Sequence, residues 1–151
     1  MSRISLASVA LLVVVTSGVA WAAKTVSLEG IKCPLSGAPA KADKMVNHLD
    51  GQVHFCCDNC VKKFSGDKEK FAAKANHQLV ATKQYEQKAC PFSGGGLNAD
   101  TAIELAGAKV AFCCNNCKGK AEKMSDADKV ENLFGKAAFE KAKFAKVEAK
   151  K

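Results

Sequence analysis

Four cysteines recur at the same spacing twice along this chain, and this repetition constrains the fold more than any other feature of the sequence. A shift of 57 residues superposes the first set on the second: Cys33, Cys56, Cys57 and Cys60 on Cys90, Cys113, Cys114 and Cys117. Segments 33–60 and 90–117 then share 12 of 28 residues without a gap. Self-similarity at a fixed spacing indicates repeated structural units. The sequence therefore predicts two copies of one small unit.

Each copy begins with a turn and continues into a β-hairpin. The turn reads Cys-Pro-x-Ser-Gly at 33–37 and again at 90–94. In the first copy, Asp50-Gly51 is a strong two-residue turn signal between alternating apolar residues. In the second copy the signal is weaker and shifted, at Ala106-Gly107. The expected strands are 45–49 and 52–55 in the first copy, and 102–105 and 109–112 in the second.

Helical spacing follows each cysteine cluster. Cys57, Cys60, Val61 and Phe64 fall at i, i+3, i+4 and i+7, which places them on one face of a helix. Further helices are expected near 67–76 and 126–150, the second of them rich in lysine. The predicted fold class is α+β, with two tandem units that each contain a turn, a hairpin and one or two helices.

The first 22 residues have the pattern of a secretory signal peptide. Arg3 precedes an apolar run at 11–15, and small residues surround Ala20-Trp21-Ala22. The apolar run is too short to span a membrane, so no stable membrane insertion is expected after cleavage. The expected units are then 23–79 and 80–151, and the expected location is periplasmic or secreted.

The charge of the chain argues against nucleic-acid binding. There are 23 Lys+Arg against 15 Asp+Glu, and Arg3 is the only arginine. Lysine is a strongly hydrated point charge that is poorly suited to bidentate recognition of bases or phosphates.

The only acidic pair common to both copies is Asp43 and Asp100, which we expect in turns or caps. An enzyme is therefore not predicted.

The spacing of the cysteines is suited to a metal site in each copy. In the Cys-Pro-x-Ser-Gly turn a serine stands where a zinc knuckle has its second thiolate, so each turn offers one thiolate and the cluster must supply the rest. Small units of this size are marginal without a metal, a disulfide or a partner. Thiolates select Zn²⁺, Cu⁺ and related soft ions.

The three histidines do not repeat between the copies, so none can be a ligand common to both sites. His54 shares a strand face with Cys56 and is kept as a candidate ligand in the first copy alone. His48 and His77 are expected at the surface.

The cysteine spacing resembles that of a known metal-binding family. The pattern Cys33, twenty-two residues, Cys56, three residues, Cys60 is similar to the TRASH domain, and it recurs in the second copy. The Cys-Pro-x-Ser-Gly opening and the Val-x-Phe-Cys-Cys ending also resemble exported relatives of the YHS domain. The resemblance covers roughly 45 residues in each copy.

This resemblance implies a small treble-clef-like module in each unit, of a kind associated with sensing, trafficking or resistance of copper, zinc or mercury. It assigns three ligands to each site, and the extra cysteine of each copy becomes a candidate fourth ligand. The first site would hold Cys33, Cys56, Cys60 and the candidate Cys57; the second would hold Cys90, Cys113, Cys117 and the candidate Cys114. The expected partners are metal ions and a metal-handling membrane or periplasmic protein. No DNA-binding domain accompanies the modules, which argues against a transcription sensor.

Two other functions remain open at this point. The Cys57-x-x-Cys60 and Cys114-x-x-Cys117 pairs could serve thiol–disulfide exchange, although the βαβ context that usually accompanies such a motif is missing. An even number of cysteines in an exported chain also fits an interaction module held together by disulfides. Adjacent cysteines are strained partners, so such disulfides would run from Cys33 to the cluster.

Overall fold

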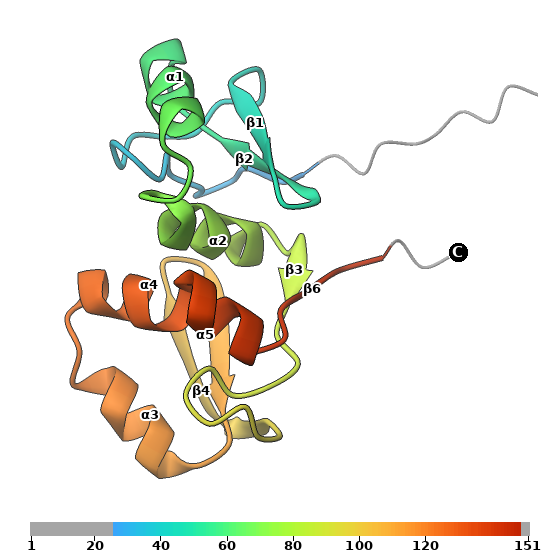
Figure 1. Cartoon of the computed structure of the whole chain (residues 1–151), viewed down its shortest axis with the longest axis vertical. Coiled ribbons are helices and arrows are strands. Elements are labelled where there is room, and N and C mark those ends of the chain that lie inside the picture. Colours follow the sequence, from blue (N-terminus) through green and yellow to red (C-terminus); the bar gives the residue numbers. More distant parts are fainter. Residues whose placement is uncertain (1–25, 149–151) are drawn as a thin grey trace, which may run out of the picture.

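Two small units, each with an antiparallel hairpin and helices, make up the part of the chain that this computed structural model describes, residues 26–148 (Figure 1). The expected signal peptide, 1–22, lies outside the described residues. The α+β prediction is confirmed for both units. The elements of the first unit are β1 (Met45–His48), β2 (Gly51–His54), α1 (Asp58–Gly66) and α2 (Ala72–Ala81). Those of the second are β4 (Asn98–Leu105), β5 (Ala108–Phe112), α3 (Asn115–Glu122), α4 (Asp126–Phe134) and α5 (Lys136–Lys141).

Both hairpins form, and their turns are equivalent. His48 pairs with Gly51, so the first turn consists of Leu49 and Asp50 and not of Asp50 and Gly51 as predicted. The second turn lies where it was predicted, at 106–107, since Leu105 pairs with Ala108. Because 49 and 106 are 57 apart, the predicted shift between the turns was wrong.

Gly51 serves packing and not the turn. A Cβ atom at this position would lie 2.6 Å from Leu79 Cδ2 and 3.1 Å from Gln84 Oε1. The first residue of the turn, Leu49, instead adopts the left-handed conformation itself, with φ at 51°. The glycine therefore allows α2 to approach the start of β2 closely.

The predicted helices differ from those observed in their bounds. The helix expected near 67–76 begins at Ala72 and continues to Ala81. The long lysine-rich helix expected over 126–150 was wrong: α4 and α5 are separated at Gly135, which has φ −57° and ψ 157°, and α5 ends at Lys141. A Cβ at Gly135 would overlap Glu131 O, so a side chain is excluded there. None of the helices within 26–148 combines the length and the apolar character needed to cross a bilayer.

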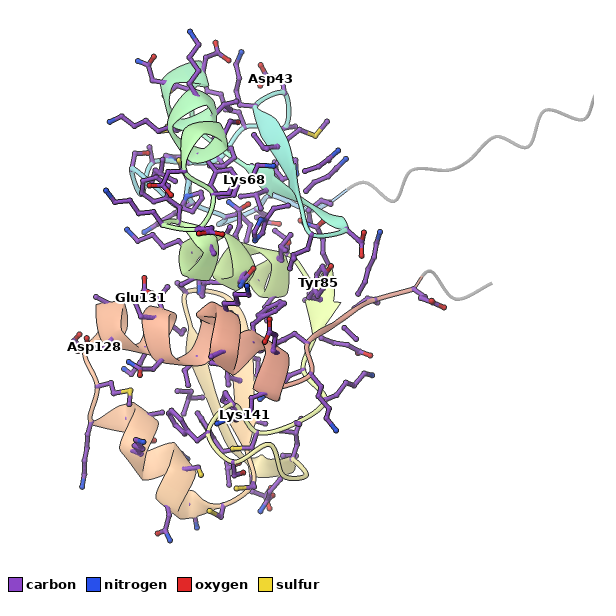
Figure 2. The ribbon with its side chains drawn as sticks, in the orientation of Figure 1. Asp43, Lys68, Tyr85, Asp128, Glu131 and Lys141 are labelled. Atoms are coloured by element: carbon purple, nitrogen blue, oxygen red, sulfur yellow. The ribbon has the colours of Figure 1, made fainter. Side chains whose placement is uncertain are left out.

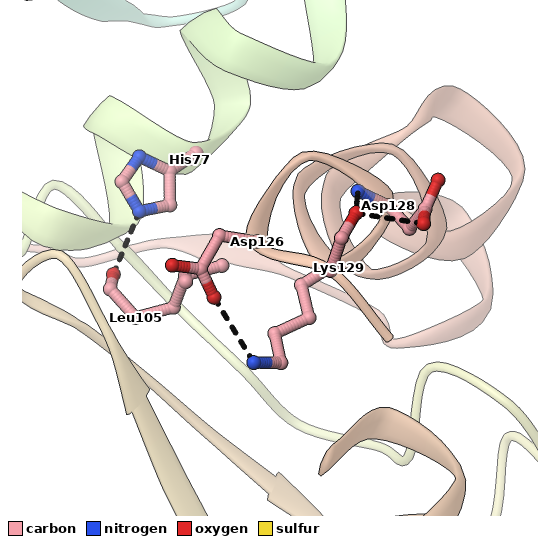
Figure 3. A network of polar contacts seen from close by, with 6 residues as sticks. His77, Leu105, Asp126, Asp128 and Lys129 are labelled. Carbon is pink, nitrogen blue, oxygen red and sulfur yellow. Dashed lines mark hydrogen bonds and ion pairs between the residues drawn. The ribbon is translucent and has the colours of Figure 1, made fainter. Parts of the chain in front are cut away.

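Helix α2 joins the two units. It packs against β2 of its own unit and against α4 and β5 of the second unit, and it lies between them in Figure 1. Asn76 on this helix accepts a hydrogen bond from His48 Nε2 at 2.9 Å and donates one to Phe134 O at 2.8 Å. His77 donates from Nε2 to Leu105 O at 2.8 Å (Figure 3) and packs edge-on against Phe134. His48 and His77 are thus partly buried at a junction, and the prediction that they lie at the surface was wrong.

The chain segments after α2 and α5 repeat one another at a spacing of 60. The same three N–H···O bonds close both helices, with donors 60 residues apart. After α2 they run from Thr82 to Gln78, from Lys83 to Val80 and from Gln84 to Leu79. After α5 they run from Ala142 to Ala138, from Lys143 to Glu140 and from Phe144 to Phe139. Lys83 and Lys143 both have a left-handed φ, 57° and 50°. The structural repeat therefore continues well beyond the segment that the sequences share.

The strands that follow these two helix ends pair with each other. In the antiparallel pair of β3 (Tyr85–Glu86) and β6 (Ala145–Lys146), Tyr85 faces Lys146 and Glu86 faces Ala145. These are corresponding residues of the two repeats in exchanged positions, which is the pairing that a local twofold axis produces. Tyr85 lies at this junction (Figure 2): its hydroxyl accepts a hydrogen bond from Asp50 N, and its ring packs on Phe139.

Candidate metal centres

Three cysteine sulfurs converge in each unit. The Sγ atoms of Cys33, Cys56 and Cys60, the first thiol cluster, all lie within 4.8 Å of one another. The second thiol cluster, with the same spacing limit, consists of Cys90, Cys113 and Cys117. Within them, Cys56 and Cys60 are 3.7 Å apart and Cys113 and Cys117 are 3.6 Å apart, sulfur to sulfur. Each cluster could hold a metal ion.

The Cys-Pro-x-Ser-Gly turn positions the most buried sulfur of each cluster. In the first unit Cys33 N donates to Ala38 O at 2.7 Å and Gly37 N donates to Cys33 O at 2.9 Å, which closes a tight loop around the cysteine. Gly37 has φ 73°, a conformation that favours glycine. Gly94 takes the same φ in the second unit. The result is that Cys33 is 2% exposed and Cys90 0% exposed.

The strand-to-helix transition positions the other two sulfurs. β2 ends at His54, and Phe55, fully buried, packs against Phe64 of α1 with ring centroids 5.2 Å apart. This contact fixes the helix relative to the hairpin. The chain then turns at Cys56 and Cys57 so that Cys60, in the first turn of α1, reaches back toward Cys56. The structure thus brings together Cys56 and Cys60, which the family resemblance assigned to one site.

The turn serine contacts each cluster as a hydrogen-bonding group. Ser36 Oγ lies 3.1 Å from Cys56 Sγ, and Ser93 Oγ donates to Cys113 Sγ at 3.2 Å. The serine oxygens are held in place because they accept from the backbone N–H of Ala38 and of Gly95. Hydroxyl donation favours an ionised sulfur. The serines were considered from the sequence only as poor ligands, and this role as a donor to sulfur was missed.

The pKa values within each cluster are spread apart. Burial alone would raise the pKa of Cys33, but the Ser36 hydroxyl and neighbouring backbone N–H groups outweigh it and lower the pKa to about 7. In the same way, against the effect of burial, Ser93 and nearby N–H groups lower the pKa of Cys90 to about 6. Burial, followed by the neighbouring thiols, raises the pKa of Cys60 and of Cys117 to about 12. Each cluster therefore contains one sulfur that ionises readily near neutral pH and one that keeps its proton until a cation displaces it.

The fourth cysteine of each unit lies beside its cluster and is not part of it. Cys57 and Cys114 are exposed residues at the N-caps of α1 and α3. Their sulfurs are 3.6 and 3.7 Å from those of Cys56 and Cys113. Hydrogen bonds from the backbone N–H of Cys60, and from that of Cys117 in the second unit, lower the pKa of these thiols.

Neither His54 nor the shared aspartates join the clusters. His54 is 4% exposed, and neither of its ring nitrogens has a hydrogen-bond partner among the described residues. Its nitrogens lie outside the group of atoms that includes Cys33, and burial lowers its pKa. Asp43 and Asp100 are exposed, and Asp43 pairs with Lys44 at 3.6 Å. Within residues 26–148 each candidate site is therefore made of sulfur alone.

The two clusters, the flanking serines and the exposed cysteines recur with nearly the same geometry in both units, so the arrangement belongs to the repeat and not to one unit. Comparisons of the chain with models of protein families, with curated proteins and with solved structures found no match.

Proposed function

We propose that this protein is an exported metal-binding protein that captures, stores or delivers a soft metal ion through its two thiol clusters. The single observation that supports this most strongly is the convergence of three sulfurs in each unit, from a turn and from a helix start that lie more than twenty residues apart. We also propose that each unit is a treble-clef-like module similar to TRASH and YHS domains. The cysteine spacing supports this part of the proposal.

The composition of the clusters supports a soft ion. Thiolates prefer Cu⁺, Zn²⁺ and toxic heavy metals such as mercury over Mg²⁺ or Ca²⁺. Structural zinc sites are usually four-coordinate, whereas each cluster supplies three sulfurs within 4.8 Å. The ion is cargo in this proposal, and the protein performs no catalysis on it.

Binding would also stabilise each unit. The ion would connect the Cys-Pro-x-Ser-Gly turn to the start of α1 or α3. Ligand binding to the folded state alone adds its free energy to folding. A metal-handling membrane or periplasmic protein is the proposed partner.

The proposal is tested by measuring bound metal and free thiols on one sample. The chain is purified from its own compartment without oxygen or added metal, and two ions per chain with all thiols reduced are expected from the two clusters. Cys33→Ser and Cys90→Ser should each lower the content to one ion, and the double variant should bind none. His54→Ala is the matched control and should keep both ions, because His54 lies outside the cluster.

Two results would contradict the proposal. A chain without metal and without free thiols would favour the disulfide-bonded interaction module. A metal-free chain with one dithiol per unit that is reduced near the potential of thioredoxin would favour thiol–disulfide exchange.

A further inference from the structure

The exposed thiols of Cys57 and Cys114 are reactive groups for which the two clusters provide no role. Both occupy the N-cap of a helix in extended backbone, with φ −159° and −160°. Both place sulfur within 3.7 Å of the middle cysteine of the cluster, Cys56 or Cys113. Two of the seven residues 54–60 differ from those at 111–117, and both thiols and their geometry are common to the two copies.

Burial increases step by step from these thiols into each cluster. In the first unit Cys57 is exposed, Cys56 is partly buried, Cys60 is 9% exposed and Cys33 is 2% exposed. In the second unit Cys114 is exposed, Cys113 and Cys117 are partly buried and Cys90 is 0% exposed. An ion that arrives from solvent can therefore bind the Cys57 or Cys114 sulfur before it reaches the buried one.

We propose that Cys57 and Cys114 are exchange ligands, which receive the ion from a soft-donor carrier and pass it into the cluster without binding it in the loaded state. This inference rests on the proposed function, since it requires that the clusters bind metal. The carrier is a protein or small molecule that presents an accessible thiolate or thioether.

The transfer is a sequence of ligand substitutions at the ion. The sulfurs of Cys57 and Cys56 first form bonds to the ion as the bonds to the carrier break. The bond to Cys57 then breaks as bonds to Cys33 and Cys60 form. Each thiol that binds releases its proton to water, and the Cys57 thiolate returns to the proton equilibrium of an exposed thiol. The oxidation state of the ion does not change.

Proximity is the physical reason that such a ligand would matter. A carrier cannot contact Cys33 directly at 2% exposure, so exchange without an intermediate would need the turn to open. A sulfur held 3.6 Å from Cys56 acts at a high effective concentration and replaces the carrier before the ion is released to water.

The test measures affinity and transfer rate separately, with Cu⁺ as the probe under anaerobic conditions. The reduced full chain is loaded with Cu⁺, and transfer to bathocuproine disulfonate is followed by stopped-flow absorbance. The double variant Cys57→Ser/Cys114→Ser should still bind two ions with affinity within about threefold of wild type. The rate of this transfer out of the protein should fall by about tenfold or more.

The control is Asn59→Ser/Asn116→Ser, which changes exposed residues of the same helix turns and should leave both quantities unchanged. An affinity loss as large as that of Cys56→Ser/Cys113→Ser would overturn the inference, because Cys57 and Cys114 would then be resident ligands. An unchanged transfer rate would overturn it as well. A wild-type chain that takes up no Cu⁺ while it binds Zn²⁺ would contradict only the inference for Cu⁺ exchange, and a chain that binds neither ion would overturn the proposed function itself.

Discussion

A pair of glutamines performs the same task in the two units from unrelated places in the chain. Gln78, on α2, accepts from His54 N at 2.6 Å and donates to His54 O and to Lys32 O. Gln87, in the segment before the second turn, accepts from Ala111 N at 2.8 Å and donates to Ala111 O and to Ala89 O. Each amide closes the open edge of a strand and ties it to the residue before the first cysteine of the cluster. Unpaired edges of this kind are costly when buried.

Replacing Gln78 should destabilise the protein more than replacing an exposed residue of the same helix. Gln78→Leu leaves the N–H and the C=O of His54 buried without partners, and we expect the free energy of unfolding to fall by about 2–3 kcal/mol. Urea denaturation of the reduced, metal-free chain measures this. Lys74→Leu, an exposed position on the same helix, should change it by less than about 0.5 kcal/mol. Equal effects of the two would show that water replaces the amide.

At the scale of single residues the sequence predicted the cluster cysteines and little of what surrounds them. Repetition singled out four cysteines in each copy, and the resemblance to the TRASH domain selected Cys33, Cys56 and Cys60 among those of the first. The glutamines could not be found in this way, since residues 78 and 87 do not correspond and no pattern relates them. The burial of His54 could not be predicted either. Strand alternation predicts one exposed face, whereas residues on both faces of β2 are buried.

Among the elements, the first hairpin was predicted correctly, but its turn was predicted one residue too late. Asp50-Gly51 is a strong turn dipeptide, yet the turn falls one residue earlier because Gly51 is needed where Leu79 packs against β2. In the second unit Ala108 occupies the equivalent position and is fully buried. The helix contacts on the two hairpins therefore differ, although the hairpins themselves correspond.

Gly51→Ala tests this interpretation. The added methyl group would meet Leu79 Cδ2 at 2.6 Å, so the core must shift, and we expect a loss of about 1–3 kcal/mol in the free energy of unfolding. Thermal and urea denaturation would both report it. Gly66→Ala serves as the control, since no atom lies within 4 Å of a Cβ at that position. A Gly51→Ala variant as stable as wild type would mean that α2 can move away from β2 without penalty.

The C-terminal helix was over-predicted because composition outweighed local geometry. Lysine and alanine favour helix throughout 136–143, but Lys143 turns left-handed and the chain leaves α5 to pair with β3. The pairing partner is sixty residues away, so no local pattern could indicate it. Tertiary contacts of this kind routinely override helix propensity.

For the molecule as a whole, the free energy of unfolding should depend on pH through the histidines at the junction between the units. Burial, the main effect, lowers the pKa of His77 and of His48 below the ordinary value of 6.5. The unfolded chain therefore binds more protons than the folded chain once the pH falls below about 6.5, and the free energy of unfolding decreases from there downward. The contribution of these two histidines is retained in full above that pH.

His77→Gln separates this effect from other titrations. The amide can still donate to Leu105 O but does not titrate, so the variant should lose less stability than wild type between pH 7 and 5. The difference in slope cannot exceed about 1.4 kcal/mol per pH unit for one histidine. Urea denaturation of the metal-free chain at several pH values measures it. Parallel pH profiles for the two proteins would show that His77 does not contribute.

The recurrence of the hairpin and of the cysteine cluster was predictable from the sequence, whereas the contacts between the two copies were not. The repeat is visible because cysteine positions are fixed by the cluster. The contacts of α2 with α4 and β5 arise from residues that do not repeat, such as Asn76 and His77, and only the folded chain brings them to Phe134 and Leu105.

The exchanged pairing of β3 and β6 has a consequence for the ancestry of the chain. Corresponding segments that bind each other antiparallel are what two identical subunits present in a symmetric dimer, where every contact must occur twice. A duplication that joined two such subunits end to end would release each half from that obligation. One-sided bonds such as that between His77 and Leu105 could then arise, and each half could acquire its own glutamine while the sulfurs stayed in place. Such a duplication would account for the exchanged pairing of β3 with β6 beside hydrogen bonds that occur in one unit only.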